Sequence, residues 1–96
     1  MSEKKINLVC KARLDKYKNI TEKALEIAKK SIVEGREKEA KEILEMVSCY
    51  LSDAKHFEQE GHYVNAFACL NYAHGWFDCG ARLKIFDVKD NNLFTV

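Results

Sequence analysis

The 96-residue sequence contains no proline and only four glycines. Because proline breaks helix interiors, its absence leaves long helices uninterrupted and favours a helical chain. The sequence also lacks any stretch approaching the roughly 20 apolar residues that a bilayer-spanning helix needs. Its first residues, MSEKKINLVCKARLDKYK, have no apolar run of the signal-peptide kind. We therefore expect a cytoplasmic protein that does not associate with membranes.

Motifs for metal, cofactor or covalent chemistry are also missing. The four cysteines (Cys10, Cys49, Cys69 and Cys79) form no CxxC or His-x-Cys pair. In a reducing compartment such cysteines act mostly as small buried hydrophobes, and we expect that role here. The three histidines show no i, i+4 pair, no Glu-x-x-His occurs, and there is no glycine-rich phosphate loop. The sequence therefore predicts neither a metal nor a cofactor.

The apolar fraction of 47% and the charged fraction of 32% are typical of one globular domain. The net charge of +1 is unevenly spread: residues 1–41 hold twelve Lys and Arg against seven Asp and Glu, and residues 42–96 hold four against eight. A basic first helix beside an acidic second one explains this asymmetry. A basic strip that binds nucleic acid is the alternative, weaker because Lys alternates with Glu at helical spacing. The strip would consist of Lys4, Lys5, Lys11, Arg13, Lys16 and Lys18.

Apolar periodicity predicts three helices, over residues 3–33, 36–60 and 62–85. In the first helix, a capping box of Asn19 and Glu22 would place a break or a new start at Asn19, and a continuous helix remains equally open. Gly35 is expected to cap this helix in a left-handed conformation. The short connection at Gly61 makes the second and third helices antiparallel, which pairs Tyr50 with Tyr72.

The helix over 62–85 is apolar on most of its circumference, which predicts burial between neighbours or against a partner chain. One stripe contains Tyr63, Ala66, Phe67, Leu70, Ala73, Phe77 and Ala81, and a second contains Cys69, Tyr72, Trp76, Cys79, Leu83 and Phe86. A polar stripe consists of Asn71, His74, Asp78 and Arg82.

The expected fold is all-α, an up-and-down antiparallel three-helix bundle forming one domain over residues 1–96. Residues 86–96 are expected to be a short non-helical C-terminal tail. Asp and Asn in the stretch KDNN suit a turn, so the tail is a hairpin on the bundle, an arm that lends Phe94 and Val96 to another molecule, or a frayed end.

The stretch NYAHGWFDCGARL, residues 71–83, concentrates the candidate functional residues. Gly75 and Gly80 are explained by close helix packing, or else a glycine keeps space open over Trp76 for a ligand. His74, Asp78 and Arg82 form a ladder at i, i+4 and i+8, either as structural pairing or as part of a site. The candidate binding residues are Asp53, Tyr72, His74, Trp76, Asp78 and Arg82.

Asp53 lies one turn from Tyr50 and Phe57 in the second helix, and the hairpin count places it opposite Cys69 and Tyr72. A tyrosine hydroxyl bonded to this carboxylate is the structural interpretation. A carboxylate beside a tyrosine and a thiol in a catalytic site is the alternative, and it requires a perturbed pKa.

Residues 50–83 resemble an archaeal family of uncharacterised proteins, domain of unknown function 357. The residues that carry the resemblance are Tyr50, Asp53, Ala54, Phe57, Gly61, Val64, Ala66, the run YAHGW at 72–76, Asp78, Gly80, Arg82 and Leu83. The resemblance implies a small up-and-down helical bundle and no particular activity. The sequence departs from the family pattern at His62, where an Asp would follow the glycine, at Cys79, where Ala is usual, and at Lys84, where Gly often closes the motif.

From these features we expect a non-catalytic interaction module that forms a homo-oligomer or binds a protein partner through the third helix and the tail. A small-ligand or catalytic site at the interface of the second and third helices is the first alternative. Nucleic-acid binding by the basic N-terminal segment is the second.

Overall fold

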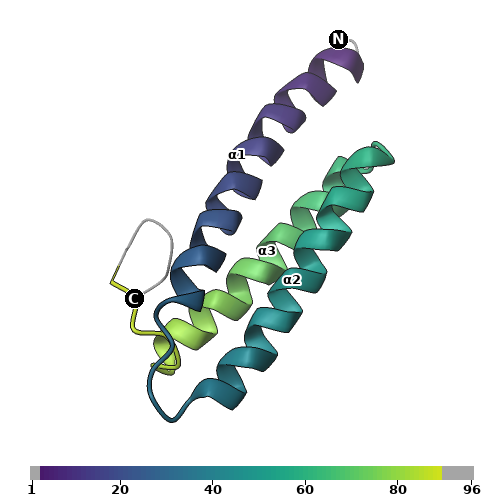
Figure 1. The fold of residues 1–96 in the computed structure, drawn as a ribbon. Coiled ribbons are helices and arrows are strands. Elements are labelled where there is room, and N and C mark those ends of the chain that lie inside the picture. The colour runs from purple at the N-terminus through teal and green to yellow at the C-terminus, as the bar shows by residue number, and fades with distance from the viewer. Residues whose placement is uncertain (1–2, 90–96) are drawn as a thin grey trace.

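The protein is an up-and-down bundle of three antiparallel helices (Figure 1). The computed structural model describes residues 3–89, with side chains from residue 11 onward. Helix α1 spans Glu3–Lys29, α2 spans Glu37–Gln59 and α3 spans Tyr63–Arg82. The described residues form no strand beyond one isolated bridge, so the predicted all-α bundle is confirmed.

Helix α1 is continuous through Asn19, which excludes the break considered from the sequence. It ends at Lys29, four residues before the predicted end. The reason is a long-range contact: Ile32 forms an antiparallel bridge with Phe86, and the amide of Val33 donates to the carbonyl of Ile85 at 2.9 Å. These residues must be extended to reach the tail. Gly35 does have a positive φ of 91°, but it lies in the turn before α2 and does not cap α1.

The reversal between α2 and α3 is a Schellman motif centred on Gly61. The amide of His62 donates to the carbonyl of Phe57 at 2.8 Å, and the amide of Gly61 donates to that of Glu58 at 3.0 Å. Gly61 has a φ of 79°, a left-handed conformation that glycine adopts without a steric penalty. His62 stands at the N-cap of α3 without a side-chain capping bond. The predicted turn at Gly61 is therefore confirmed.

A second Schellman motif ends α3, with Lys84 in the position that usually holds glycine. The amide of Ile85 donates to the carbonyl of Gly80 at 2.8 Å, and the amide of Lys84 donates to that of Ala81 at 3.1 Å. Lys84 consequently has a φ of 59°. This turn directs Ile85 and Phe86 back over the end of the bundle, where both are buried. Residues 90–96, including most of the predicted turn and Phe94 and Val96, lie outside the described part of the chain.

The core runs along the middle of the bundle, and α2 and α3 pack most closely. Many of its members are small, which lets the helices approach one another. The buried hydrophobic side chains among the described residues are Leu14, Ala24 and Ala28 of α1, Ala40, Ile43, Val47, Leu51 and Ala54 of α2, Ala66, Cys69, Leu70, Ala73 and Phe77 of α3, and Ile85 and Phe86 of the tail. Full burial of a side chain such as Phe77 contributes about 1.5 to 3 kcal/mol to folding.

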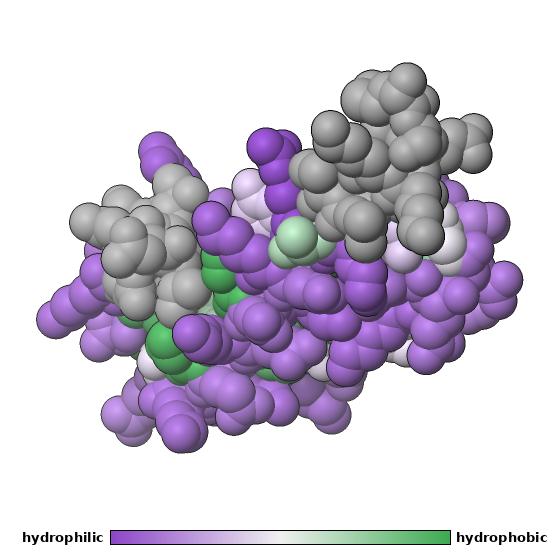
Figure 2. All heavy atoms as spheres, turned by 90° about the horizontal axis from the view of Figure 1, so that it is seen from above, coloured by the Kyte–Doolittle hydropathy of each residue, from purple (hydrophilic) through white to green (hydrophobic). Residues whose placement is uncertain are grey.

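The face drawn in Figure 2 is mostly hydrophilic, and hydrophobic side chains show there only in small areas. Among residues 3–89, none of the helices combines the length and the apolar character that crossing a lipid bilayer requires.

Candidate functional site

Helix α3 has one buried and one exposed apolar stripe. The stripe through Ala66, Leu70, Ala73 and Phe77 is fully covered. Of the other stripe, Cys69 and Phe86 are buried, but the residues between them are open: Tyr72 is 62% exposed, Trp76 37% and Leu83 57%, and Cys79 is exposed as well. The predicted burial between neighbouring helices of the same chain is therefore wrong for this half of α3, and burial against a partner chain stays a prediction. Two neighbouring helices cannot surround α3 completely, and the flank of α3 that faces away from α1 is left uncovered.

We call one exposed surface the aromatic strip. It consists of three residues of α3 (Tyr72, Trp76 and Cys79), the C-cap residue Leu83 and the half-buried Tyr50 of α2. The rings of Tyr50 and Tyr72 stack with their centroids 5.5 Å apart and an interplanar angle of 22°. This contact confirms the register predicted from the turn at Gly61.

A shallow hollow of about 340 Å³ lies on the aromatic strip, lined by Asn71, Tyr72, Gly75, Trp76 and Cys79. A Cβ atom added at Gly75 would meet nothing within 4 Å. Packing within the chain therefore does not explain this glycine, contrary to one of the two predictions. Gly75 instead exposes the backbone of α3 at the floor of the hollow.

Gly80 differs from Gly75 in its surroundings. A Cβ atom there would lie 2.6 Å from two ring carbons of Phe86 and 3.2 Å from the Cδ1 atom of Ile43. The absence of a side chain at Gly80 therefore lets Phe86 close the end of the core. The packing explanation holds for this glycine.

The edge of α2 beside the aromatic strip is acidic. Glu39, Glu42 and Asp53 are exposed and share this side of the helix with Tyr50, given 100° per residue. Two observations support this placement for Glu39 and Asp53. Arg36 donates to Glu39 at 2.8 Å and to the carbonyl of Leu83 at 3.3 Å, and the charge of Asp53 acts on Cys69.

Cys69 is buried beneath this edge, and its surroundings disfavour the thiolate. Burial raises the pKa of the Cys69 thiol, and the negative charge of Asp53 raises it further. The thiol is therefore protonated at neutral pH and is a poor nucleophile. In the described part of the chain no hydrogen bond joins Asp53 to a tyrosine, so the predicted bond between them is not formed. Cys49 and Cys79 are exposed, which corrects the expectation of buried cysteines for those two.

His74 faces α1 and is half-buried. Its Nε2 atom lies 2.7 Å from the hydroxyl of Thr21, which is fully buried. Thr21 donates its own hydrogen to the carbonyl of Tyr17 at 2.8 Å, so His74 must donate and Thr21 accept in the second bond. Burial lowers the pKa of His74, and the nearby charge of Asp78 partly opposes that effect. His74 is therefore a neutral structural contact between α1 and α3.

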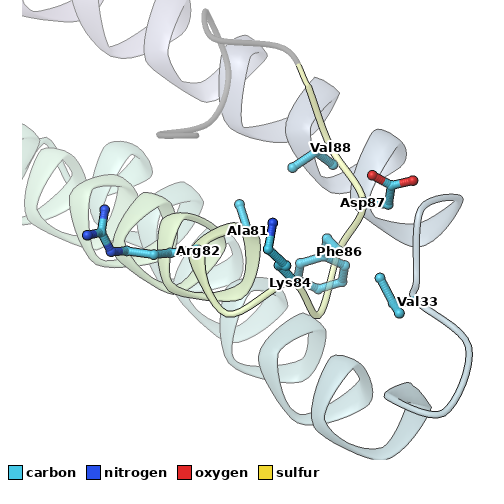
Figure 3. Close-up of a pocket in the computed structure, with 7 residues that line it drawn as sticks. All are labelled: Val33, Ala81, Arg82, Lys84, Phe86, Asp87 and Val88. Carbon is cyan, nitrogen blue, oxygen red and sulfur yellow. The ribbon is translucent and has the colours of Figure 1, made fainter.

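Arg82 lies at the other end of the bundle, beside a second hollow of about 370 Å³. The residues that line this hollow are Val33, Ala81, Arg82, Lys84, Phe86, Asp87 and Val88. Figure 3 shows the guanidinium of Arg82 pointing away from Phe86 and Asp87. Arg82 is therefore not directed at Asp87, the acidic residue of this hollow.

The six predicted candidates do not converge on one pocket. Tyr72 and Trp76 share the hollow on the aromatic strip, Asp53 lies on the acidic edge of α2, and Arg82 borders the second hollow. His74 faces α1, and its neighbour Asp78 is half-buried. Among the described residues, no three His, Cys, Asp or Glu side chains gather closely enough to hold a metal ion. Only the pair of aromatic candidates therefore lies in a shared surface feature.

The basic residues of α1 are partly neutralised by α2. Lys18 and Lys11 bond to Glu58 at 2.9 and 3.2 Å. The hydrogen bond from Lys18 is the main cause that lowers the pKa of the Glu58 carboxyl, and Lys11 adds to it. This geometry matches the first of the two explanations of the charge asymmetry. Arg13 and Lys16 are exposed, and no ion pair with another described residue involves them.

A family model described as "Protein of unknown function (DUF357)" matches residues 16–86. The match extends well beyond residues 50–83, which carry the sequence resemblance. It includes about half of α1, all of α2 and α3, and the start of the tail. Neither the curated proteins nor the solved structures give a match to the chain.

Proposed function

The chain belongs to the DUF357 family of proteins of unknown function, and because that membership brings no activity with it, we propose from the geometry of α3 that the protein is a non-catalytic interaction module that self-associates. The surface that mediates self-association is the aromatic strip.

The exposure of large apolar side chains in one helical row carries this proposal. Tyr72, Trp76 and Leu83 are all exposed, although the opposite face of the same helix is completely packed. Contiguous exposed apolar surface on a small protein marks interaction sites, and Trp and Tyr are enriched among residues that dominate binding energy. The stacked Tyr50 and Tyr72 rings add rigid contact area that loses little entropy on binding.

Among the side chains that the structure describes, no acid, base and nucleophile converge, which supports the non-catalytic part of the proposal. General acid–base catalysis needs titratable groups within hydrogen-bond reach of one reacting atom. Here the Cys69 thiol is buried and protonated, and His74 is engaged with Thr21 on the far side of α3. Asp53 lies on the surface of α2. These groups have different neighbours and do not share a pocket.

Sedimentation equilibrium over a wide concentration range tests self-association. We expect a concentration-dependent dimer in the wild type. Truncation of a central interface aromatic typically costs at least about 2 kcal/mol, so Trp76→Ala should raise the dissociation constant at least tenfold. Tyr63→Ala, which removes an aromatic ring from another face of α3, is the matched control. A strict monomer at the highest soluble concentration would contradict the proposal.

A small-ligand role for the same hollow is the second candidate, favoured by its size and by Gly75. Its volume of about 340 Å³ is near the lower end of the range for ligand pockets. Its lining offers uncharged polar groups on Asn71, Tyr72 and Trp76, a thiol on Cys79, and no charged side chain. A thermal-shift screen against metabolites tests this candidate, and a saturable rise in melting temperature that Gly75→Leu abolishes would favour it over self-association.

Nucleic-acid binding by the basic segment is less well supported, because Lys11 and Lys18 are already bonded to Glu58. Binding with the steep salt dependence of phosphate contacts would be its signature.

A further inference from the structure

We propose that the occupant of the aromatic strip is the N-terminal part of α1 from a second copy of the chain, held by contacts between its basic side chains and the acidic edge of α2. This inference rests on the proposed self-association and names the segment that fills the surface.

The aromatic strip has the shape that a docking helix needs. Glycine in a helix interior costs about 1 kcal/mol relative to alanine, and no packing contact with residues 11–89 accounts for Gly75. Its missing side chain leaves a hollow between Tyr72, Trp76 and Cys79. An apolar side chain of a second helix can enter that hollow and approach the backbone of α3.

The charge on one side of the strip selects the partner. The row of α2 residues that borders it contains Glu39, Glu42, Met46, Tyr50 and Asp53, with three carboxylates and no cation. Glu39 pairs with Arg36, but among the described residues no ion pair satisfies Glu42 or Asp53. A helix with apolar residues on one face and Lys or Arg beside them complements this surface.

The N-terminal part of α1 has that composition. Ile6, Val9 and Cys10 follow the i, i+3, i+4 spacing that places residues on one helical face, and Lys4 and Lys5 precede them. The charge distribution of the whole chain also supports this occupant, because the first 41 residues have a net positive charge and the remaining residues a net negative charge.

The backbone also places this segment beyond its own bundle. Lys11 bonds to Glu58, one residue before the end of α2, so the turns of α1 that precede Lys11 continue past the α2–α3 reversal. Figure 1 shows α1 extending beyond that reversal. Because α1 is an unbroken helix from Glu3 to Lys29, the segment cannot fold back onto the strip of its own chain, which lies on the flank opposite α1. A second copy can supply it.

A charge-exchange experiment tests the proposal, with sedimentation equilibrium at low salt as the measurement. The double variant Lys4→Glu/Lys5→Glu should raise the dissociation constant of the dimer by about tenfold or more, in the range of measured couplings between close charges at interfaces. Adding Glu42→Lys and Asp53→Lys to the same chain should restore much of the affinity. The control Lys23→Glu/Lys30→Glu changes the net charge equally at exposed positions nearer the other end of α1 and should leave the dimer within about twofold of wild type.

The variant Gly75→Leu is an independent test that distinguishes a loss of dimerisation from a loss of folding. Leucine favours an exposed helix position over glycine, so the melting temperature should not fall. The side chain fills the hollow, so the dimer should weaken to the same extent as with Lys4→Glu/Lys5→Glu.

The outcomes separate this inference from the proposed function. A wild-type chain that is monomeric overturns both. A dimer that Trp76→Ala weakens but Lys4→Glu/Lys5→Glu does not would keep self-association through the strip and overturn the N-terminal segment as its occupant. Equal weakening by the control pair would also overturn it, because net charge alone would then explain the effect.

Discussion

The imidazole of His74 on α3 donates a hydrogen bond of 2.7 Å to the hydroxyl of Thr21 on α1, a residue with no exposed surface. Because Thr21 donates its own hydrogen to Tyr17, the bond fixes which ring nitrogen of His74 carries the proton. The two residues are 53 positions apart in the sequence, and their bond fixes the position of α3 relative to α1. The aromatic strip owes its exposure to this arrangement, since α1 covers the His74 side of α3 and leaves the Tyr72 side open.

The pKa of His74 is lowered in the folded state from its usual 6.5, chiefly by burial. The unfolded chain therefore takes up a proton more readily than the native chain. The His74 contribution to the free energy of unfolding is fully present above pH 6.5 and is lost as the pH falls from there through the folded-state pKa. Urea denaturation between pH 7.5 and 5 measures it. His74→Gln should flatten this dependence, whereas His56→Gln, at an exposed position, should keep it.

Protonation of Glu58 affects stability in a lower pH range than protonation of His74. The pKa of Glu58 is lowered below 4.5 by Lys18 and Lys11, so its contribution is present above pH 4.5 and is lost only as the pH falls further. A loss of stability that begins only below pH 4.5 would show that His74 is not buried as described.

Alanine at the two helical glycines should have opposite effects on stability. Gly75→Ala should raise the free energy of unfolding by about 0.5 to 1 kcal/mol, because the new methyl group meets open space and the helix gains propensity. Gly80→Ala should lower it by about 1 to 3 kcal/mol, because the methyl group overlaps the Phe86 ring. Chemical denaturation of both variants decides the matter. Similar shifts in the same direction would contradict the placement of Phe86.

Lys84 occupies the left-handed position at the end of α3, where its side chain costs about 1 kcal/mol or more. Lys84→Gly should therefore stabilise the protein, by somewhat less than that cost because glycine also gains freedom in the unfolded chain. Gly61→Ala at the equivalent position of the other Schellman motif should destabilise it. Melting temperatures of the pair provide the test. A fall for Lys84→Gly would mean that the lysine has a contact worth more than the strain.

Much of the α2–α3 hairpin could be predicted from the sequence because its determinants are local. Gly61 lies between two strongly periodic segments, and counting residues outward from it in both directions predicts the Tyr50–Tyr72 contact. The end of α1 could not be predicted in this way. Ile32 continues the apolar stripe of α1, and only its pairing with Phe86, far away in the sequence, draws it out of the helix.

The exposed aromatic strip could be predicted from the sequence only in part, for a related reason. Two apolar stripes on α3 are visible in the sequence, but periodicity does not show which of them the neighbouring helices cover. The same limit applies to the glycines. The sequence does not distinguish Gly75 from Gly80, and only the structure shows that Phe86 packs against Gly80. Five of the six candidate residues lie close together along α3 and the sixth, Asp53, lies on α2. The helical turn directs their side chains to different sides.

Trp76 is the only tryptophan of the chain, so its fluorescence reports directly on the aromatic strip. In the proposed dimer this surface, 37% exposed at Trp76 in the single chain, is covered when two copies meet. Emission spectra and acrylamide quenching as a function of protein concentration should show a blue shift and weaker quenching in step with the rise in mass. An emission maximum and a quenching constant that stay the same while dimers form would contradict the claim, because association would then use another face.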